Sequence, residues 1–215
     1  KKGDKFYALG EYEDAADQYK RAYAKTPVKE RPLRGKRATK LGDCYRRINN
    51  TQRAIGAYLN VVRYKQDDVQ THLYLGQQYL KNGDYKDAAK HFQIVIDSDA
   101  TNKIASVGMQ SATIAPVWKK KPSRYIVKRQ DLFNSRRSDY CPMLAGDEYD
   151  QLYFTSTRAQ AQGDELSGIT GTKNGDIFFS QKDDKGKWDK PETIESDLNS
   201  SFDEGACCFS PDNKQ

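Results

Sequence analysis

The chain has 215 residues, which is enough for one large domain or two ordinary ones. Only 36% of the residues are hydrophobic, yet 11% are aromatic and 14 are tyrosines, which is unlike the composition of a disordered chain. No apolar run approaches the ~18 residues that a membrane-spanning helix needs. The composition favours thin architectures with small cores, such as helical solenoids and β-propellers.

Charge is distributed unevenly along the chain. Residues 1–137 hold 29 Lys and Arg against 14 Asp and Glu, whereas residues 138–215 hold 7 against 16. The net charge therefore changes from +15 to −9, which indicates two bodies with different surroundings. The basic charges of the first half alternate with acidic ones, so we interpret them as a solvated face. Binding of nucleic acid is not expected, although a basic run at 119–129 would be its site.

The first hundred residues contain an internal repeat. The motif L-G-x-x-Y at residues 41–45 recurs 34 residues later at 75–79. The pattern that follows, with a small residue and an aromatic one four positions on, occurs at residues 10–22, 49–61 and 83–95. Three copies in phase resemble the tetratricopeptide repeat family over roughly residues 1–100. The resemblance implies pairs of antiparallel helices that stack into a solenoid and bind proteins on a concave face.

Each recurring residue type has a physical role in such a stack. Gly42 and Ala54 are expected where paired helices touch, because only small side chains fit there. The aromatic rings of Tyr58 and Phe92 are expected to fill the wedge between successive repeats. Gly83 is expected to end a helix with a positive φ.

The pattern also has irregular places. Asn49 stands where a glycine is usual, which predicts a looser turn. The interval between the first two copies is five residues longer than the period, which predicts a longer basic loop at residues 27–35. Residues 102–115 are predicted to form a capping helix that Pro116 ends. The chain begins inside a repeat, so we expect the natural protein to extend upstream.

The resemblance places a partner-binding groove on the first helix of each pair. Arg46, Arg47 and Lys81 are predicted to clamp a carboxylate, because arginine offers two parallel donors. The alternative is a face that contacts only water. The predicted groove residues are Lys36, Thr39, Asp43, Arg46, Arg47, Gln70, Leu73, Gln77, Leu80 and Lys81.

The second half reads as short strands. Residues 150–156 and 175–180 alternate apolar and polar side chains, residues 159–175 read as a loop, and residues 183–186 read as a hairpin turn before Trp188. Residues 138–147 resemble residues 203–212, and the second copy carries the E-G-x-x-x-F-S-P-D signature of WD-like propeller repeats. A turn at Pro211-Asp212 is expected, and we expect the carboxylates of Asp203 and Glu204 to accept backbone hydrogen bonds rather than to catalyse.

The predicted architecture is therefore multidomain, α then β. Residues 1–118 form a tetratricopeptide solenoid with a capping helix, and residues 119–215 form a linker and the incomplete N-terminal part of a propeller. This order is similar to Bacteroidetes envelope proteins that add an OmpA-like module, in particular those of type IX secretion. The resemblance implies a periplasmic, outer-membrane-associated scaffold whose partners are other envelope proteins. It also implies a lipid anchor and a peptidoglycan-binding module, which these residues do not include.

The sequence also bears on catalysis and metal binding. Phosphate-binding, dinucleotide-binding, zinc-protease and nucleophile-elbow motifs do not occur in the sequence, so no enzyme activity, cofactor or metal is expected. His72 is expected to pack inside a repeat, and His91 to lie at the surface. Cys141 could pair with Cys207 or Cys208, or these thiols could remain unpaired. The alternative function is a glycan receptor in which Trp188 stacks on saccharide.

Overall fold

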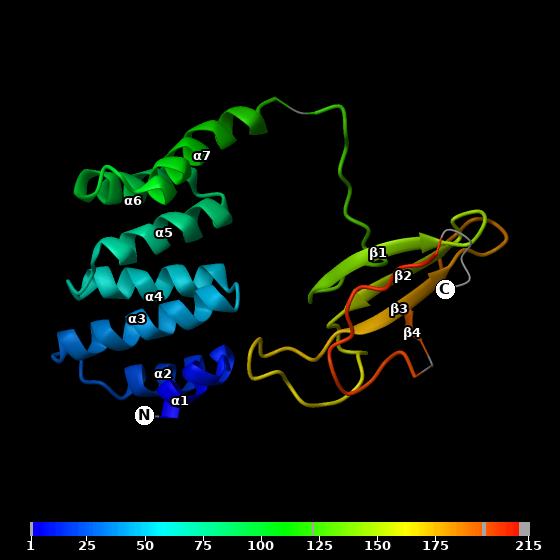
Figure 1. Ribbon diagram of the computed structural model, residues 1–215, viewed down its shortest axis with the longest axis horizontal. Coiled ribbons are helices and arrows are strands. Elements are labelled where there is room, and N and C mark those ends of the chain that lie inside the picture. The colour runs from blue at the N-terminus through cyan, green and yellow to red at the C-terminus, as the bar shows by residue number, and fades with distance from the viewer. Residues whose placement is uncertain (1, 122, 195–196, 211–215) are drawn as a thin grey trace. The chain divides into compact units, whose positions relative to one another are not determined.

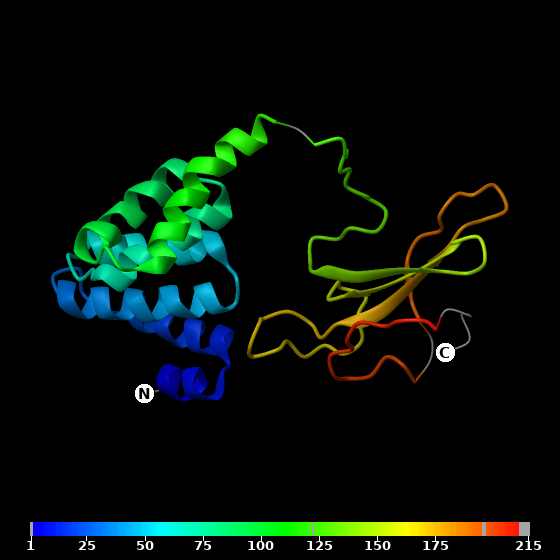
Figure 2. The ribbon, with the colours of Figure 1, turned by 45° about the horizontal axis from the view of Figure 1, so that its top comes forward.

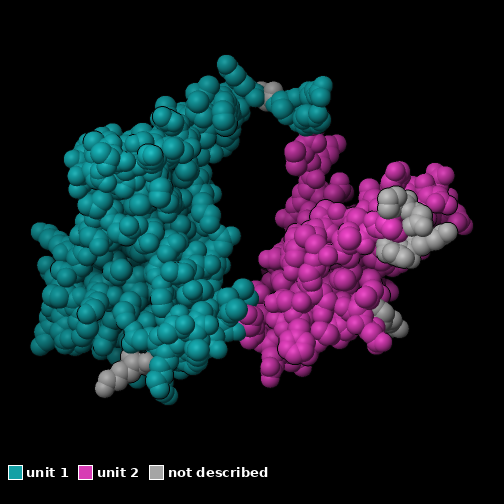
Figure 3. Space-filling view, in the orientation of Figure 1, with its two compact units in different colours: residues 1–125, 168–170 teal, residues 126–167, 171–215 magenta. Residues whose placement is uncertain are grey.

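The computed structural model describes residues 2–121, 123–194 and 197–210. The chain divides into two compact units, residues 1–125 with 168–170 and residues 126–167 with 171–215 (Figure 3). The first unit is helical and the second contains an antiparallel sheet. Within the residues described, none of the helices has both the length and the apolar character to cross a membrane.

The helices of the first unit stack in chain order, each against the next (Figure 1). Successive helices run in opposite directions, so that they form hairpins, as Figure 2 shows from a second side. The helices described are α1 (Lys2–Leu9), α2 (Tyr12–Ala24), α3 (Arg31–Arg47), α4 (Thr51–Arg63), α5 (Val69–Asn82), α6 (Tyr85–Ser98) and α7 (Lys103–Lys119). The predicted α-solenoid is confirmed.

Glycines in α3 and α5 allow aromatic rings from the following helices to approach the backbone. A Cβ added to Gly42 would lie 2.8 Å from Cε1 of Tyr58, and one added to Gly76 would lie 2.7 Å from Cε1 of Phe92. Tyr58 is fully buried, and its ring centroid lies 5.7 Å from that of Tyr74 in the next repeat. The predicted contact at Gly42 and the wedge role of Tyr58 are therefore confirmed.

Four helices are followed by a residue in the left-handed conformation, namely Gly10, Asn49, Lys65 and Gly83. Gly83 follows α5 with φ +83°, as predicted. Asn49 follows α3 with φ +60°, and the side chain of Asn50 then accepts a hydrogen bond from the backbone N–H of Arg53 at 3.4 Å. Asn49 thus adopts the left-handed conformation that Gly83 adopts in the next repeat, and asparagine enters this region more readily than most residues.

Two other expectations about the helices were wrong. The five extra residues do not lengthen a loop, because α3 already begins at Arg31 and absorbs most of them. Pro32 fits there because the first turn of a helix does not use its backbone N–H groups. Pro116 does not end α7, which continues to Lys119. A proline removes one hydrogen bond of the helix but leaves the last turn after it able to form.

The second unit is built on one sheet with the strand order β1-β2-β3-β4, all neighbours antiparallel. Four strands is the number in one propeller blade. The register of β1 against β2 shifts between Tyr140 and Met143, and Cys141 has φ +53° there. The strands are β1 (Asp139–Ala145), β2 (Gln151–Ser156), β3 (Asp176–Gln181) and β4 (Glu192–Thr193).

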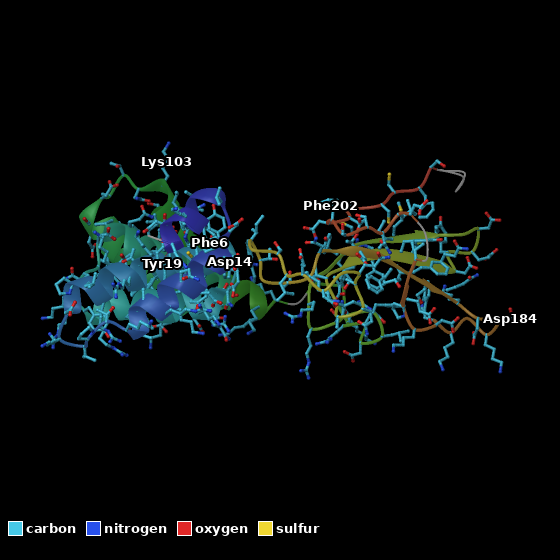
Figure 4. The ribbon with its side chains drawn as sticks, turned by 90° about the horizontal axis from the view of Figure 1, so that it is seen from below. Phe6, Asp14, Tyr19, Lys103, Asp184 and Phe202 are labelled. Atoms are coloured by element: carbon cyan, nitrogen blue, oxygen red, sulfur yellow. The ribbon has the colours of Figure 1, made fainter. Side chains whose placement is uncertain are left out.

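The two faces of this sheet are covered differently. Leu152, Phe154 and Phe178 form the core on one face, with Phe133 and Trp188 packed against them. The other face carries residues 199–210, which we call the closing segment; Phe202 lies on it (Figure 4).

Of the connections predicted in the second unit, the loop and the hairpin turn lie within the described residues. Residues 159–175 contain no strand or helix in the described structure. The predicted hairpin turn forms, because Gly186 has φ +74° and the Asp183 carboxylate accepts from the backbone of Lys185 and Lys187 at 2.9 Å each. The turn predicted at residues 211–212 lies outside the described residues.

Candidate partner-binding groove

The first five helices enclose a hollow of about 360 Å³. Its aromatic lining comes from four tyrosines on four different helices, and its polar lining comes mainly from α3. Tetratricopeptide-like stacking brings these side chains together because the first helix of each hairpin faces the same side. The lining residues are Asp4, Tyr7, Tyr19, Thr39, Lys40, Asp43, Tyr58 and Tyr74.

Asp43 is the centre of the polar contacts in this hollow. Its carboxylate accepts a short hydrogen bond from the Tyr7 hydroxyl and one from Arg46 at 2.5 Å, and Nε of Arg47 lies 3.6 Å away. Burial works to raise the pKa of Asp43, but these hydrogen bonds outweigh it and lower the pKa. Burial and the Asp43 carboxylate together raise the pKa of Tyr7 to about 12. Asp43 is therefore ionised and Tyr7 is neutral at pH 7.

Arg46 and Arg47 also lie over aromatic rings. The Arg46 guanidinium is 4.1 Å from the ring centroid of Tyr74, and that of Arg47 is 5.4 Å from Tyr7 and 5.0 Å from Tyr12. Such cation–π contacts contribute about 0.5–1 kcal/mol each at exposed sites. Both arginines are therefore held by Asp43 and tyrosine rings, so a carboxylate from a partner would compete with Asp43 for them.

Lys40 is neutralised in the same way at the other end of the hollow. Its ammonium group forms a short ion pair with Asp4 and lies 5.2 Å from the ring centroid of Tyr19. The Tyr19 hydroxyl donates to the same carboxylate at 3.0 Å. The charged side chains that line the hollow are thus engaged, Lys40 with Asp4 and Asp43 with the two arginines. The rest of the lining is Thr39 and the four tyrosines.

Tyr58 forms the floor of the hollow and is fully buried. Its hydroxyl makes no hydrogen bond of ordinary geometry in the described structure and lies beside the Arg46 guanidinium. The floor of the hollow therefore offers mainly the surface of an aromatic ring.

The remaining predicted groove residues are placed differently. Leu73 is only 6% exposed and packs with Phe92 in the core, so its predicted place on the binding face is wrong. Its counterpart one repeat earlier, Thr39, is exposed and lines the hollow. The others lie outside the hollow: Lys36 and Gln70 are exposed, Gln77 and Leu80 are half-buried, and Lys81 donates to Asn49 at 2.5 Å.

The tyrosines of the hollow were not predicted. Tyr74 stands 34 residues after Lys40, so the repeat itself aligns one lining residue with another. That alignment was the available signal. Tyr7 and Tyr58 carried no such signal, because a tyrosine in a helix is equally consistent with packing alone.

The two histidines of the third repeat contact each other. Nδ1 of His72 lies 2.9 Å from Nδ1 of His91, and Nε2 of His72 lies 2.9 Å from the Asp67 carboxylate. The His91 ring stacks on Tyr79 with its centroid 5.5 Å away. His91 is thus half-buried between helices, not at the surface as predicted, because its ring fills the gap between α5 and α6.

The second unit has a hollow of its own, of about 510 Å³, lined by Trp188, Phe133, Tyr140 and neighbouring residues. Trp188 packs edge-on against Phe133 at 5.5 Å, and Nζ of Lys182 lies 4.9 Å from its ring.

The carboxylates at the start of the closing segment accept backbone hydrogen bonds, as predicted. Asp203 accepts from Gly175 at 2.7 Å, and Glu204 accepts from Ser200 at 3.0 Å.

The comparison with known families concerns the helical unit. The family model described as tetratricopeptide repeat matches residues 1–61 and 39–103. No curated protein matches the sequence. The matched residues cover α1 to α6, which contain all the residues that line the hollow of the helical unit. Tetratricopeptide repeats mediate protein–protein interactions, and the match supports a scaffold role for the helical unit.

Proposed function

We propose that the chain is a non-catalytic scaffold that holds a segment of a partner protein in the hollow of its helical unit. One observation carries this proposal: four tyrosines from four helices line one hollow, and their charged neighbours are already paired. The repeats build such a surface without a chemical group poised to react. Binding, rather than turnover, is what this arrangement supports.

The lining also defines the partner's chemistry. Because the ionic groups are satisfied internally, affinity would come from aromatic contact and from a few hydrogen bonds. Burial of one aromatic or aliphatic side chain against the tyrosines is worth about 1.5–3 kcal/mol. The preferred partner is therefore an apolar or aromatic peptide segment.

The place of action belongs to the same proposal. The order of helical repeats followed by a four-stranded sheet is similar to PorE of type IX secretion and related OmpA-family envelope proteins. The proposed location is the periplasm, in a complex of the outer membrane. Attachment to the cell wall would depend on a module that these residues do not include.

Affinity capture from an envelope extract tests this function. Tyr74→Ala removes an aromatic wall of the hollow, and Tyr125→Ala is a matched control because that tyrosine is 68% exposed and lies outside the hollow. Melting curves first establish that both variants fold. An envelope protein should be captured by the unsubstituted chain and by the control, but not by Tyr74→Ala. Equal capture by all three would contradict the proposal.

A glycan receptor is the second candidate, favoured by the position of Trp188 in the lining of the hollow in the second unit. Its ring is partly used in packing against Phe133, which leaves less surface for a saccharide. Calorimetry with muropeptides distinguishes the two candidates. Saturable heat that disappears in Trp188→Leu would favour the glycan receptor over the protein scaffold.

A further inference from the structure

The closing segment is attached to one face of the sheet at both of its ends. Near its start, the backbone N–H of Glu204 donates to the carbonyl of Gly175 at 2.8 Å. The hydroxyl of Thr155 on β2 donates to the carbonyl of Gly205 at 2.8 Å. Further along, the ring of Phe209 lies 4.8 Å from that of Tyr153, also on β2.

These two contacts place residues 205–209 beside the stretch of β2 from Thr155 to Tyr153. Cys207 lies between the two contacts, near the level of Phe154. On the other side of β2, Thr155 pairs with Tyr140 and Tyr153 pairs with Met143. The residues level with Phe154 on β1 are therefore 141 and 142, in the irregularity of the strand.

Cys207 is thus at the same level along the sheet as Cys141. Its solvent exposure differs from that of its neighbour Cys208. Cys207 is partly buried, whereas Cys208 is exposed. This difference agrees with the alternation of an extended chain, in which residues 205, 207 and 209 face the same side. Burial raises the pKa of the Cys207 thiol, and the nearby Cys141 thiol adds to the rise. Cys141 itself is exposed and open to reagents.

We propose that Cys141 and Cys207 form a disulfide site that joins the closing segment to the edge strand β1. The oxidant is a small disulfide such as oxidised glutathione. The Cys141 thiolate attacks it, forms a mixed disulfide and releases one glutathione. The Cys207 thiolate then attacks the Cys141 sulfur and displaces the second glutathione. Two thiols lose two protons and two electrons, and one disulfide of glutathione is reduced to two thiols.

The expected consequence is a closing segment that stays on the sheet. In the thiol form hydrogen bonds hold mainly residues 199–205, and the ring of Phe209 contacts Tyr153 near the other end. The disulfide would close a loop between residues 141 and 207, and a crosslink of this length restricts the unfolded chain strongly. We therefore expect the oxidised form to resist proteolysis within residues 199–210 better than the reduced form does.

Peptide mapping of the native, full chain tests the site. The chain is treated with oxidised glutathione, alkylated and digested with trypsin without reduction. The expected product joins the peptide 138–158 to the peptide 188–214, and the thiol count falls from four to two. Cys208→Ser should leave this product unchanged, and Cys207→Ser should abolish it.

Other products would overturn the proposal. A link between neighbouring Cys207 and Cys208 would appear within the peptide 188–214 alone. A link that survives Cys207→Ser would assign Cys208 instead. Stable glutathione adducts or covalent dimers in place of the link would show that Cys141 and Cys207 are not within reach. Cys44 serves as the internal control, because burial raises its pKa to about 12 and should keep it unmodified.

Discussion

The ring of Tyr58 lies directly on the backbone of α3 at Gly42, where an added Cβ would be 2.8 Å from the ring. The same relationship recurs 34 residues later between Phe92 and Gly76. Tyr58 also forms part of the hollow that we assign to partner binding. The contact between Tyr58 and Gly42, which packs α4 against α3, therefore also positions the floor of the candidate site.

Replacing Gly42 by alanine should destabilise the helical unit. The added methyl group would force the Tyr58 ring to move, and overpacking of this kind typically costs about 1–3 kcal/mol. Gly56→Ala is the matched control, because nothing lies within 4 Å of its added Cβ. Alanine is the better helix former by about 1 kcal/mol, so the control should be stabilised. Urea unfolding followed by circular dichroism measures both, and equal midpoints would contradict the contact.

The buried ion pair of the second unit should be sensitive to loss of one partner. Arg158 is 8% exposed, donates to Asp139 at 2.7 Å and to the carbonyl of Phe133 at 2.6 Å. Arg158→Met leaves the Asp139 carboxylate without its cation, which costs about 3–5 kcal/mol for buried pairs. The exposed pair of Arg129 and Asp131 is the control.

Near-ultraviolet circular dichroism during heating follows this effect. The transition of the second unit should move to lower temperature in Arg158→Met and remain in place in Arg129→Met.

Burial works to raise the pKa of Asp139, but hydrogen bonds from Ser156 and Arg158 lower it overall. Its stabilising contribution is therefore present above the unfolded value of about 3.9 and is lost as the pH falls below it.

Acidification should destabilise the third repeat at a higher pH than the one at which it destabilises the second unit. Burial, followed by the neighbouring His72, lowers the pKa of His91 below its ordinary value. The unfolded chain then binds a proton more tightly than the folded chain, so stability is intact above about pH 6.5 and declines as the pH falls through that value. The linkage also has a structural reason, since two protonated rings cannot share the 2.9 Å contact between their Nδ1 atoms.

Urea midpoints measured between pH 8 and pH 5 test this linkage. His91→Phe keeps a ring against Tyr79 but removes the proton-binding nitrogens. Its stability should change less over this range than that of the unsubstituted chain. A variant with the same pH dependence as the unsubstituted chain would show that His91 is not responsible.

The sequence predicted those features that follow from the repeat. Gly42, Tyr58 and Gly83 could be assigned because each occupies a fixed position in a helical hairpin, and local sterics decide which residue fits. Leu73 could not be placed from the pattern, since the rotation of α5 against α6 and α7 decides whether it faces the groove or the core. Pro116 misled for a different reason: a proline removes one backbone hydrogen bond, but the turn after it can still form, and α7 continues to Lys119.

The charge pairs of the groove could not be predicted from the sequence either. Arg46 and Arg47 looked available to a partner because their nearest acidic neighbour, Asp43, was itself counted as part of the face. The tyrosine rings that hold the two guanidinium groups come from other helices. Only the stacking of those helices shows that the arginines are already engaged.

Site-specific photo-crosslinking tests the central claim most directly. A benzophenone amino acid at position 39 would stand at the rim of the hollow, because Thr39 is exposed and lines it. The same group at Gln93, which is exposed on α6 outside the hollow, is the control. The account predicts a crosslinked partner protein from position 39 and none from position 93. Crosslinks of equal yield at both positions, or from position 93 alone, would contradict it.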